Sequence, residues 1–278
     1  MSKLTRGMHN LLGIPQWTPA MPKAYKMKHE ERKMENSQKA EENESSLKVV
    51  YFPSCINQTM GKSKGQSTPL IDKMVALMEK AGYEVIFPKN MKNLCCGTIW
   101  ESKGMPDIAD RKAKELDDAL FEASDGGRYP VLCDQSPCLH RMRNTIKRVK
   151  LYEPVEFIYE YLAPHLRFVQ TDEPVALHFT CSTRHMNLND MFVALAGMCT
   201  TKVVVPEEVG CCGFAGDKGF TDPEVNRYAL RKLRKQLEAA GVKRGFSNSR
   251  TCEIGLTVNG GVPYQSIAYL VDECTIKK

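Results

Sequence analysis

The stretch KVVYFPSC, residues 48–55, opens a pattern that returns later in the chain as VALHFTC, residues 175–181. Each copy begins with β-branched or aromatic residues, which favour a buried strand, and ends in a cysteine. Each copy continues with a second strand, a proline, a loop and a vicinal cysteine pair followed by glycine: YEVIFPKNMKNLCCG (83–97) and TKVVVPEEVGCCG (201–213). The chain therefore contains an internal repeat, and this repeat decides the fold.

The repeat extends through helices and a third strand. The further matches, first copy against second, are an apolar helix over 71–82 and 189–197, a longer amphipathic helix over 105–120 and 225–237, and PVLCDQSPC (130–138) against RGFSNSRTC (244–252). Strands that alternate with helices indicate parallel sheets. We predict an α/β fold of two tandem, pseudo-repeated CCG units, each a small parallel sheet flanked by helices, at 48–164 and 165–278.

The residues before the repeat differ in composition. Pro15, Pro19 and Pro22 favour an extended path, and we interpret Trp17 on this path as a residue that docks on a protein surface. Residues 23–47 are charged and almost without large apolar side chains, which is typical of a linker or a solvated helix. Residues 1–47 are therefore predicted to be a docking segment followed by a charged linker.

Eight of the 11 cysteines occupy equivalent places in the two copies. The first quartet is Cys55, Cys95, Cys96 and Cys138, and the second is Cys181, Cys211, Cys212 and Cys252. Because they follow strand ends or lie in glycine-containing loops, we expect each quartet at the carboxyl edge of its sheet, where ligands bind. Four thiolates suffice for zinc or an iron–sulfur cluster. The alternative, eight buried small hydrophobic residues, leaves the matching positions unexplained.

Composition excludes several other classes of protein. The 278 residues carry a formal net charge of +6, and eight cluster-bound thiolates would account for this excess without nucleic acid. No apolar run reaches the length of a membrane span, and no secretory signal begins the chain. No disulfide framework is expected without export, and no GxGxxG or Walker-type loop supports nucleotide binding. We expect a cytoplasmic protein, with peripheral attachment to the inner face of the membrane as an alternative.

Three motifs give the sequence a family resemblance: HFTCSTRHM (178–186), CCGFAGDKGF (211–220) and SNSRTCEIGL (247–256). With the IPQWTPAMP lead-in, they resemble the C-terminal cysteine-rich CCG region of FAD-linked, iron–sulfur D-lactate and D-2-hydroxyglutarate dehydrogenases. More distant resemblances are the cysteine-rich subunit of heterodisulfide reductase and the iron–sulfur subunit of glycolate oxidase. The resemblance implies a [4Fe–4S] cluster bound by the quartets and electron transfer from flavin towards a quinone or cytochrome.

Two departures from the family pattern limit this resemblance. Relatives often end each half with Cys-x-x-Cys, but Gln135 and Ser249 stand where the first of those cysteines would be. This departure disfavours the noncubane cluster of heterodisulfide reductases and leaves a cubane cluster or zinc. The FAD domain and ferredoxin-like segment of full-length relatives are also absent. We therefore expect these as partner domains, in the same polypeptide or another subunit, and we expect no hydroxyacid oxidation by this chain alone.

Other side chains near the quartets are weaker candidates, and we assign no catalytic residue. Those that could support a cluster or contact a substrate are Cys133, His178, Arg184, His185, Lys218 and Arg250. Core packing is the preferred interpretation for Cys133, and His140 is a weaker candidate still. Cys199 and Cys274 lie outside the repeat and are predicted to be inert. The alternative functions are a thiol or disulfide oxidoreductase and a zinc-stapled docking domain without catalysis.

Overall fold

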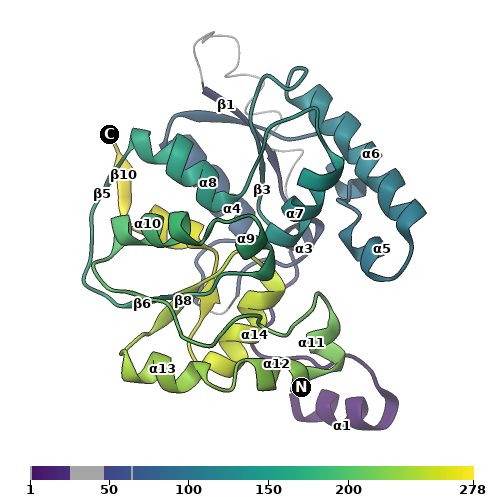
Figure 1. Ribbon diagram of the computed structural model, residues 1–278, viewed down its shortest axis with the longest axis vertical. Coiled ribbons are helices and arrows are strands. Elements are labelled where there is room, and N and C mark those ends of the chain that lie inside the picture. The colour runs from purple at the N-terminus through teal and green to yellow at the C-terminus, as the bar shows by residue number, and fades with distance from the viewer. Residues whose placement is uncertain (1, 26–46, 64) are drawn as a thin grey trace.

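The computed structural model describes residues 2–25, 47–63 and 65–278, and its two halves contain sheets of identical topology (Figure 1). The first sheet has the order β2-β1-β3-β4, formed by β1 (Leu47–Phe52), β2 (Tyr83–Ile86), β3 (Val131–Cys133) and β4 (Leu151–Tyr152). The second has the order β7-β6-β8-β9, formed by β6 (Val175–Leu177), β7 (Val203–Val204), β8 (Arg244–Phe246) and β9 (Tyr264–Gln265). Every pair within these sheets is parallel, which confirms the predicted α/β fold of two repeated units.

Helices connect the strands in the same sequence in both halves. The first half contains α3 (Cys55–Thr59), α4 (Leu70–Lys80), a 3₁₀ turn (Met91–Asn93), α5 (Thr98–Ser102), α6 (Pro106–Ala123), α7 (Ser136–Thr145) and α8 (Pro154–Phe157), which continues as a π-helical turn (Ile158–Leu162) and a 3₁₀ turn (Ala163–His165). The second half contains α9 (Cys181–His185), α10 (Asn189–Cys199), α11 (Lys218–Thr221), α12 (Pro223–Ala229), α13 (Leu233–Ala239), α14 (Arg250–Gly260) and α15 (Ile267–Glu273).

The single helix predicted over 225–237 is wrong, because the chain breaks between α12 and α13. The backbone there tightens from an i→i−4 bond, Leu230 to Asn226, to i→i−3 bonds, including Leu233 to Leu230. The break leaves Leu230 and Leu233 buried, whereas Val225, predicted on the apolar face, is 58% exposed. The matching helix of the first half, α6, is continuous.

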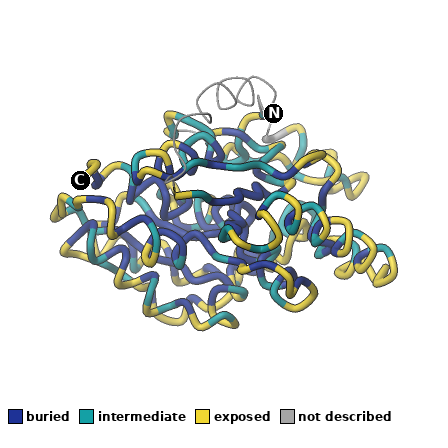
Figure 2. Tube along the Cα trace, turned by 90° about the horizontal axis from the view of Figure 1, so that it is seen from above, coloured by how far each residue is buried: buried dark blue, intermediate teal, exposed yellow. Residues whose placement is uncertain are grey.

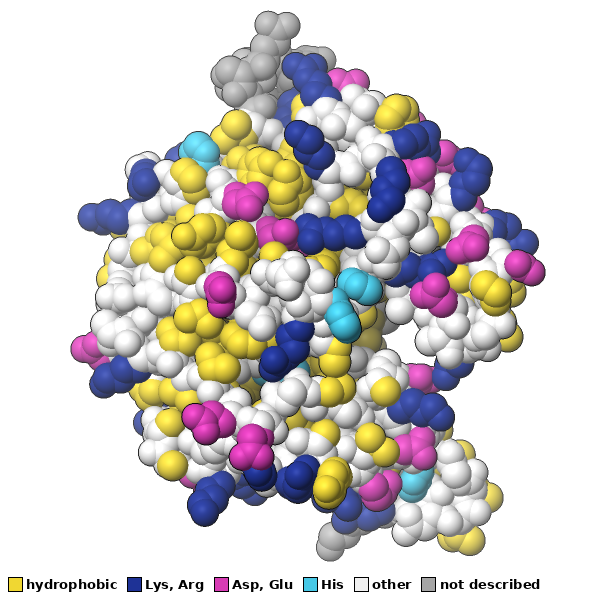
Figure 3. Space-filling model, in the orientation of Figure 1, with side chains coloured by type: hydrophobic (Ala, Val, Ile, Leu, Met, Phe, Trp, Pro, Cys, Tyr) yellow, Lys and Arg dark blue, Asp and Glu magenta, His cyan; other side chains and the backbone are white. Residues whose placement is uncertain are grey.

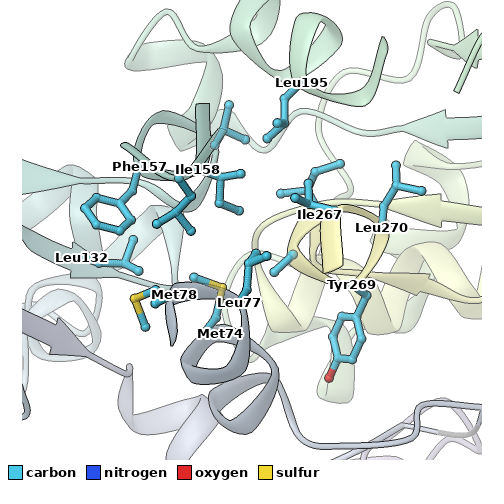
Figure 4. Close-up of a cluster of buried hydrophobic side chains, with 14 of the residues drawn as sticks. Met74, Leu77, Met78, Leu132, Phe157, Ile158, Leu195, Ile267, Tyr269 and Leu270 are labelled. Carbon is cyan, nitrogen blue, oxygen red and sulfur yellow. The ribbon is translucent and has the colours of Figure 1, made fainter. Parts of the chain in front are cut away.

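The two halves share one hydrophobic core, which lies between the sheets. Helices α4 and α8 from the first half meet α10 and α15 from the second, and Figure 4 shows their side chains converging. Residues of this core include Met74, Leu77, Phe157, Leu195, Ile267 and Leu270. Each sheet therefore buries its inner face against the same layer of helices, which joins the two halves.

Two smaller cores cover the outer faces of the sheets. Helices α6 and α7 pack on the first sheet through Leu116, Leu120 and Leu139, and α13 and α14 pack on the second through Leu233, Leu237 and Leu256. Figure 2 shows the result: the strands are buried and the outer helix surfaces are exposed. Helices therefore cover both faces of each sheet that carries a cysteine quartet.

The ends of the described chain lie against the second half. Helix α1 (Ser2–Leu12) precedes an extended segment in which Gln16 donates its backbone N–H to the Phe220 carbonyl at 2.7 Å. Trp17 on this segment is 37% exposed. The predicted linker falls largely on residues 26–46, which lie outside the described residues. No helix in the described part of the chain has the length and apolar character needed to cross a membrane.

Candidate metal centre

The first quartet gathers at the carboxyl end of β1 and β3. Cys55 begins α3 and Cys138 lies in the first turn of α7, while Cys95 and Cys96 occupy the loop before α5. A hydrogen bond from Cys138 holds the pKa of the Cys96 thiol well below its ordinary value, and the same contact raises that of Cys138. Cys95 also hydrogen-bonds to Cys96, and the charge of Cys96 helps to raise the pKa of Cys55 after burial, the larger cause. The other three thiols of the quartet thus lie around Cys96.

The second quartet is also gathered within its own half, but the thiol with the lowered pKa there is Cys211, the first cysteine of the pair. The Sγ atoms of Cys212 and Cys252 lie 2.9 Å apart. Hydrogen bonds from Cys181 and then Cys212 lower the pKa of Cys211, and the contact with Cys211 raises the pKa of Cys181. Each predicted set of four cysteines is therefore brought together within its own half.

The four thiols of each quartet have the chemistry needed to bind a metal ion or an iron–sulfur cluster. In this structure they form hydrogen bonds with one another. In the described residues no three His, Cys, Asp or Glu side chains already have the spacing of metal ligands. Sulfur atoms at 2.9 Å are closer than ligands around a metal would stand, so Cys212 and Cys252 would move apart on binding. Four thiolates on short loops are the ligands of zinc and of cubane clusters.

Each vicinal pair depends on the glycine that follows it. Gly97 has φ +87°, and a Cβ there would lie 2.4 Å from the Ala109 carbonyl oxygen of α6. Gly213 has φ +71°, and its Cβ would lie 2.9 Å from the Val225 carbonyl oxygen of α12. The loop therefore turns in a left-handed conformation directly against a helix backbone, where only glycine fits.

Backbone and side-chain contacts hold these turns in place. The N–H groups of Gly97 and Gly213 each donate to the first sulfur of the preceding pair at 3.3 Å, which is Cys95 in one half and Cys211 in the other. Such amide donors stabilise a thiolate. The identical distance in both halves indicates that the two pairs have one local geometry.

The carbonyl of the second cysteine of each pair is also bound. Arg141 of α7 donates Nε to the Cys96 carbonyl at 3.0 Å, and Asn226 of α12 donates Nδ2 to the Cys212 carbonyl at 2.5 Å. Sequence reasoning missed both residues, because they differ in type and come from non-equivalent helices. Their only sequence signal is a polar residue within an otherwise buried helix face.

A buried carboxylate fixes the turn that carries Cys55. Asp134 follows β3, accepts the Ser54 backbone N–H at 2.8 Å and accepts the Tyr51 hydroxyl at 2.7 Å. In the second half Thr180 performs the equivalent task, since its Oγ1 accepts the Thr183 N–H at 3.0 Å and caps α9. The sequence analysis also missed Asp134, whose burial is decided by the neighbouring strand.

Arg250 lies between the halves rather than against the sulfur atoms of the second quartet. The side chain is 1% exposed, donates Nε to Asn57 Oδ1 at 3.1 Å and pairs with Glu253 at 3.0 Å. Its backbone N–H donates to Gln135 Oε1 at 3.1 Å. Arg250 therefore joins α14 to α3 of the first half.

His178 and Arg184 stand beside the second quartet. His178 is buried, which lowers its pKa to about 4, and its Nδ1 lies 3.3 Å from Ser247 Oγ. Its buried Nε2 has no hydrogen-bond partner among the described atoms, and its ring interacts electrostatically with Cys211. Arg184 donates to the Phe179 and Val209 carbonyls at 3.3 and 3.4 Å.

His185 and Lys218 lie at the surface. His185 packs its ring on His140 of α7 at 5.6 Å between centroids, and Figure 3 shows histidine side chains over α7 and α9. Beside these histidines the surface is open between the part of the molecule that carries α5 and the part that carries α11. An ion pair between Lys103 Nζ and Asp217 Oδ2, 3.0 Å apart, connects the two parts. Lys218 is exposed on α11.

The remaining cysteines are buried. Cys133 is fully buried in the core that covers the outer face of the first sheet, where packing was the preferred interpretation. Cys199 and Cys274 lie in the core between the sheets, and their thiols hydrogen-bond to each other. The sequence placed these two in apolar surroundings but gave no sign that they meet.

Comparison with known families agrees with the two equivalent cysteine sets. The model of the cysteine-rich domain designated CCG matches residues 49–143 and 175–257, which together exceed half of the chain. The chain belongs to the CCG cysteine-rich domain family. Each match contains one complete quartet of this CCG protein, so the family relationship covers both halves.

Relatives of the CCG protein include a curated bacterial protein. Lactate utilization protein A 1 from Bacillus mycoides (strain KBAB4) is 22% identical over 248 residues, covering 82% of this chain and 97% of that protein. Among solved structures, an aspartate racemase from Picrophilus torridus has a TM-score of 0.36 at 7% identity, covering 84% of this chain and 96% of that one. A putative Asp/Glu racemase from Yersinia pestis has a TM-score of 0.35 at 12% identity, covering 81% and 96%. At such scores neither racemase informs the function.

Proposed function

We propose that this CCG protein is an electron-transfer component of 2-hydroxyacid oxidation, with lactate the first substrate to test, and that each half holds one iron–sulfur cluster. The observation that carries the proposal is the pair of equivalent cysteine quartets, each gathered around its glycine-bounded loop. A thiolate-bound cluster supplies single-electron transfer. The relative named for lactate utilization supports the choice of substrate class.

The proposed ligands are the eight repeated cysteines. The residues around them would orient and tune the sites: Gly97 and Gly213 by their amides, Asp134 by fixing the loop before Cys55, and Arg141 by holding the Cys96 carbonyl. Hydrogen bonds to the ligands and to the loops that carry them adjust the potential and stability of a metal site. Cys133, His185 and Lys218 have no proposed role in binding.

The two sites differ in the charges that surround them. Asp134, a buried carboxyl, acts on Cys55 in the first half, whereas Arg184 acts on Cys181 in the second. Positive charge near a site favours its reduced form. We therefore propose that the second site has the higher reduction potential, which would direct electrons from the first half to the second.

The finer proposal concerns partners. Hydride removal from a hydroxyacid needs a two-electron acceptor, and the family resemblance suggests FAD in a separate domain or subunit with a ferredoxin-like segment. A D-2-hydroxyacid dehydrogenase that passes electrons towards a quinone or cytochrome would use this chain as its relay. Cys55, Cys181 and Cys211 are exposed, and the surface opening between α5 and α11 is the place we propose for exchange with a partner.

Metal analysis tests the first part of the proposal. Protein purified without oxygen should contain iron and acid-labile sulfide, with two clusters per chain, and should give an electron paramagnetic resonance signal after reduction with dithionite. One zinc ion per quartet without iron would instead support the alternative of a zinc-stapled docking domain. Turnover of small disulfides by the cluster-loaded chain would support the alternative of a thiol or disulfide oxidoreductase.

An activity assay tests the relay. The cluster-loaded chain should not reduce a dye with D- or L-lactate or D-2-hydroxyglutarate, with or without FAD. Adding a flavoprotein dehydrogenase that carries a ferredoxin-like segment should make electrons flow from hydroxyacid to dye through this chain. Robust turnover by the chain alone would overturn the relay and place a substrate site within it.

A further inference from the structure

Cys199 and Cys274 are far apart in sequence but adjacent in the fold, and neither belongs to a quartet. Cys199 is the last residue of α10, and Cys274 directly follows α15. Their side chains are 0% and 6% exposed and share the core between the sheets. The pair therefore forms a second type of thiol site, separate from the carboxyl edges of the sheets where the quartets lie.

Backbone hydrogen bonds fix the separation of the two residues. Val169 donates its N–H to the Cys274 carbonyl at 2.8 Å, and Thr171 donates its N–H to the Cys199 carbonyl at 2.9 Å. One short segment thus binds both cysteine backbones, which lie next to each other along its edge.

The thiols themselves are in contact across this edge. A hydrogen bond from Cys199 lowers the pKa of Cys274, while the same contact, followed by burial, raises the pKa of Cys199. Cys274 also points its thiol towards the Val271 carbonyl at 3.5 Å. A pair with one thiol of lowered pKa and one adjacent neutral thiol is the arrangement of an attacking and a resolving cysteine.

We propose that Cys199 and Cys274 form a reversible disulfide, a redox modification site independent of the metal centres, whose co-reactant is a low-molecular-weight disulfide. The Cys274 thiolate attacks one sulfur of that disulfide, which forms a mixed disulfide and releases one thiolate. Cys199 then loses its proton and attacks the Cys274 sulfur, which releases the second thiolate. The two protein thiols lose two electrons and two protons, and the small disulfide becomes two thiols.

A small two-stranded sheet beside Cys274 provides access to this buried pair. Cys274 precedes β10 (Thr275–Lys277), a three-residue strand that pairs antiparallel with β5 (Leu166–Phe168). A three-residue strand in a two-stranded sheet opens more readily than a core strand, so brief separation of β10 from β5 would expose Cys274. Once formed, the bond would hold β10 against the segment that joins the two halves, since both cysteine carbonyls are bound by that segment.

The test uses the cluster-loaded protein without oxygen. The protein is equilibrated in glutathione buffers of increasing oxidised fraction, quenched in acid, alkylated and digested with trypsin. Peptides 185–202 and 251–277 should appear linked through Cys199 and Cys274, in a proportion that rises with the oxidised fraction and returns to zero with dithiothreitol. Hydrogen exchange of residues 275–277 should slow in the oxidised form, because the strand can no longer separate.

Variants separate this bond from general oxidation. Cys199→Ala and Cys274→Ala should each abolish the linked peptides, whereas Cys133→Ala, which removes another fully buried thiol, should leave them unchanged. Circular dichroism of each variant checks that it is folded. The proposal is overturned if folded wild-type protein stays unlinked at every buffer composition, if Cys274 stops at a glutathione adduct, or if the link forms only after denaturation.

Discussion

Gln135 and Ser249, which occupy matching positions in the two halves, contact each other: Gln135 Nε2 donates to Ser249 Oγ at 3.0 Å. Both are buried, and the Gln135 side chain also accepts the Arg250 N–H. In this chain they form a polar connection between the halves.

The Gln135–Ser249 contact is expected to couple the halves energetically. Gln135→Ala and Ser249→Ala should each lower the free energy of unfolding by about 1–2 kcal/mol, because each leaves a buried polar partner unsatisfied. The loss in free energy of unfolding of the double variant should be smaller than the sum of the two single losses by about 0.5–1.5 kcal/mol. Urea unfolding of the four proteins measures this coupling, and strict additivity would show that the contact contributes nothing.

Metal content should follow the quartets. Cys96→Ser should remove the metal of the first half, and Cys212→Ser that of the second, with the other half still loaded in each case. The reason is that each of these residues contacts two other cysteines of its own set. Iron and zinc analysis of the anaerobically purified variants provides the measurement.

Cysteines outside the quartets supply the matched controls. Cys199→Ser and Cys274→Ser should retain the full metal content, since neither residue contacts a quartet cysteine among the described interactions. Stability should fall only modestly, as is usual for such a small change in volume. Loss of a whole site in either control would show that the ligands have been assigned wrongly.

The glycine after each vicinal pair should tolerate no side chain. Gly97→Ala adds a Cβ that would lie 2.4 Å from a backbone oxygen, in addition to the strain of its positive φ, so we expect a loss of about 2–4 kcal/mol and reduced metal content. Gly104→Ala is the control, because Gly104 has φ +75° but nothing within 4 Å. Equal losses for the two variants, by thermal unfolding, would contradict the steric argument.

The free energy of unfolding should decrease between about pH 5 and pH 7 as Glu153 ionises in the folded protein. The contribution of Glu153 to this decrease should end by about pH 8. The carboxyl is fully buried, and its burial raises its pKa to about 7 despite hydrogen bonds from Ser136, Val155 and Asn248. The pKa of Glu153 in the folded state lies above the unfolded value of about 4.3. The stabilisation from the protonated carboxyl is therefore complete at low pH and is lost as Glu153 ionises. A shift of this size corresponds to about 4 kcal/mol as an upper bound.

Glu153→Gln should remove that part of the pH dependence, and Glu122→Gln, at an exposed residue paired with Lys89, should not. Urea unfolding of the metal-free proteins at pH 5, 6, 7 and 8 makes the comparison. Some slope should remain, because burial also raises the pKa of Glu253 to about 7. An unchanged slope in Glu153→Gln would mean that Glu153 is already ionised at pH 5 in the folded protein.

Much of the candidate site could be predicted because its cysteines and glycines occur at matching positions in both copies of the repeat. Cys55 and Cys181, or Gly97 and Gly213, have matching neighbours in the sequence, so their equivalence is visible before folding. Asp134, Arg141 and Asn226 could not be found in this way, since they act through contacts made by a different strand or helix. The break between α12 and α13 was missed for a similar reason: packing of Leu230 and Leu233 overrides the regular helical spacing.

The sequence by itself determined the elements that depend on local periodicity and on repetition: the α/β alternation, the two parallel sheets and the grouping of eight cysteines into two sets. Only the tertiary structure decided how the halves face each other, because that depends on the burial of α4, α8, α10 and α15 in one shared core. Packing of these helices is what brings Gln135 to Ser249 and Cys199 to Cys274. Contacts between residues so distant in the chain arise when apolar surface is removed from water, and no local pattern in the sequence records them.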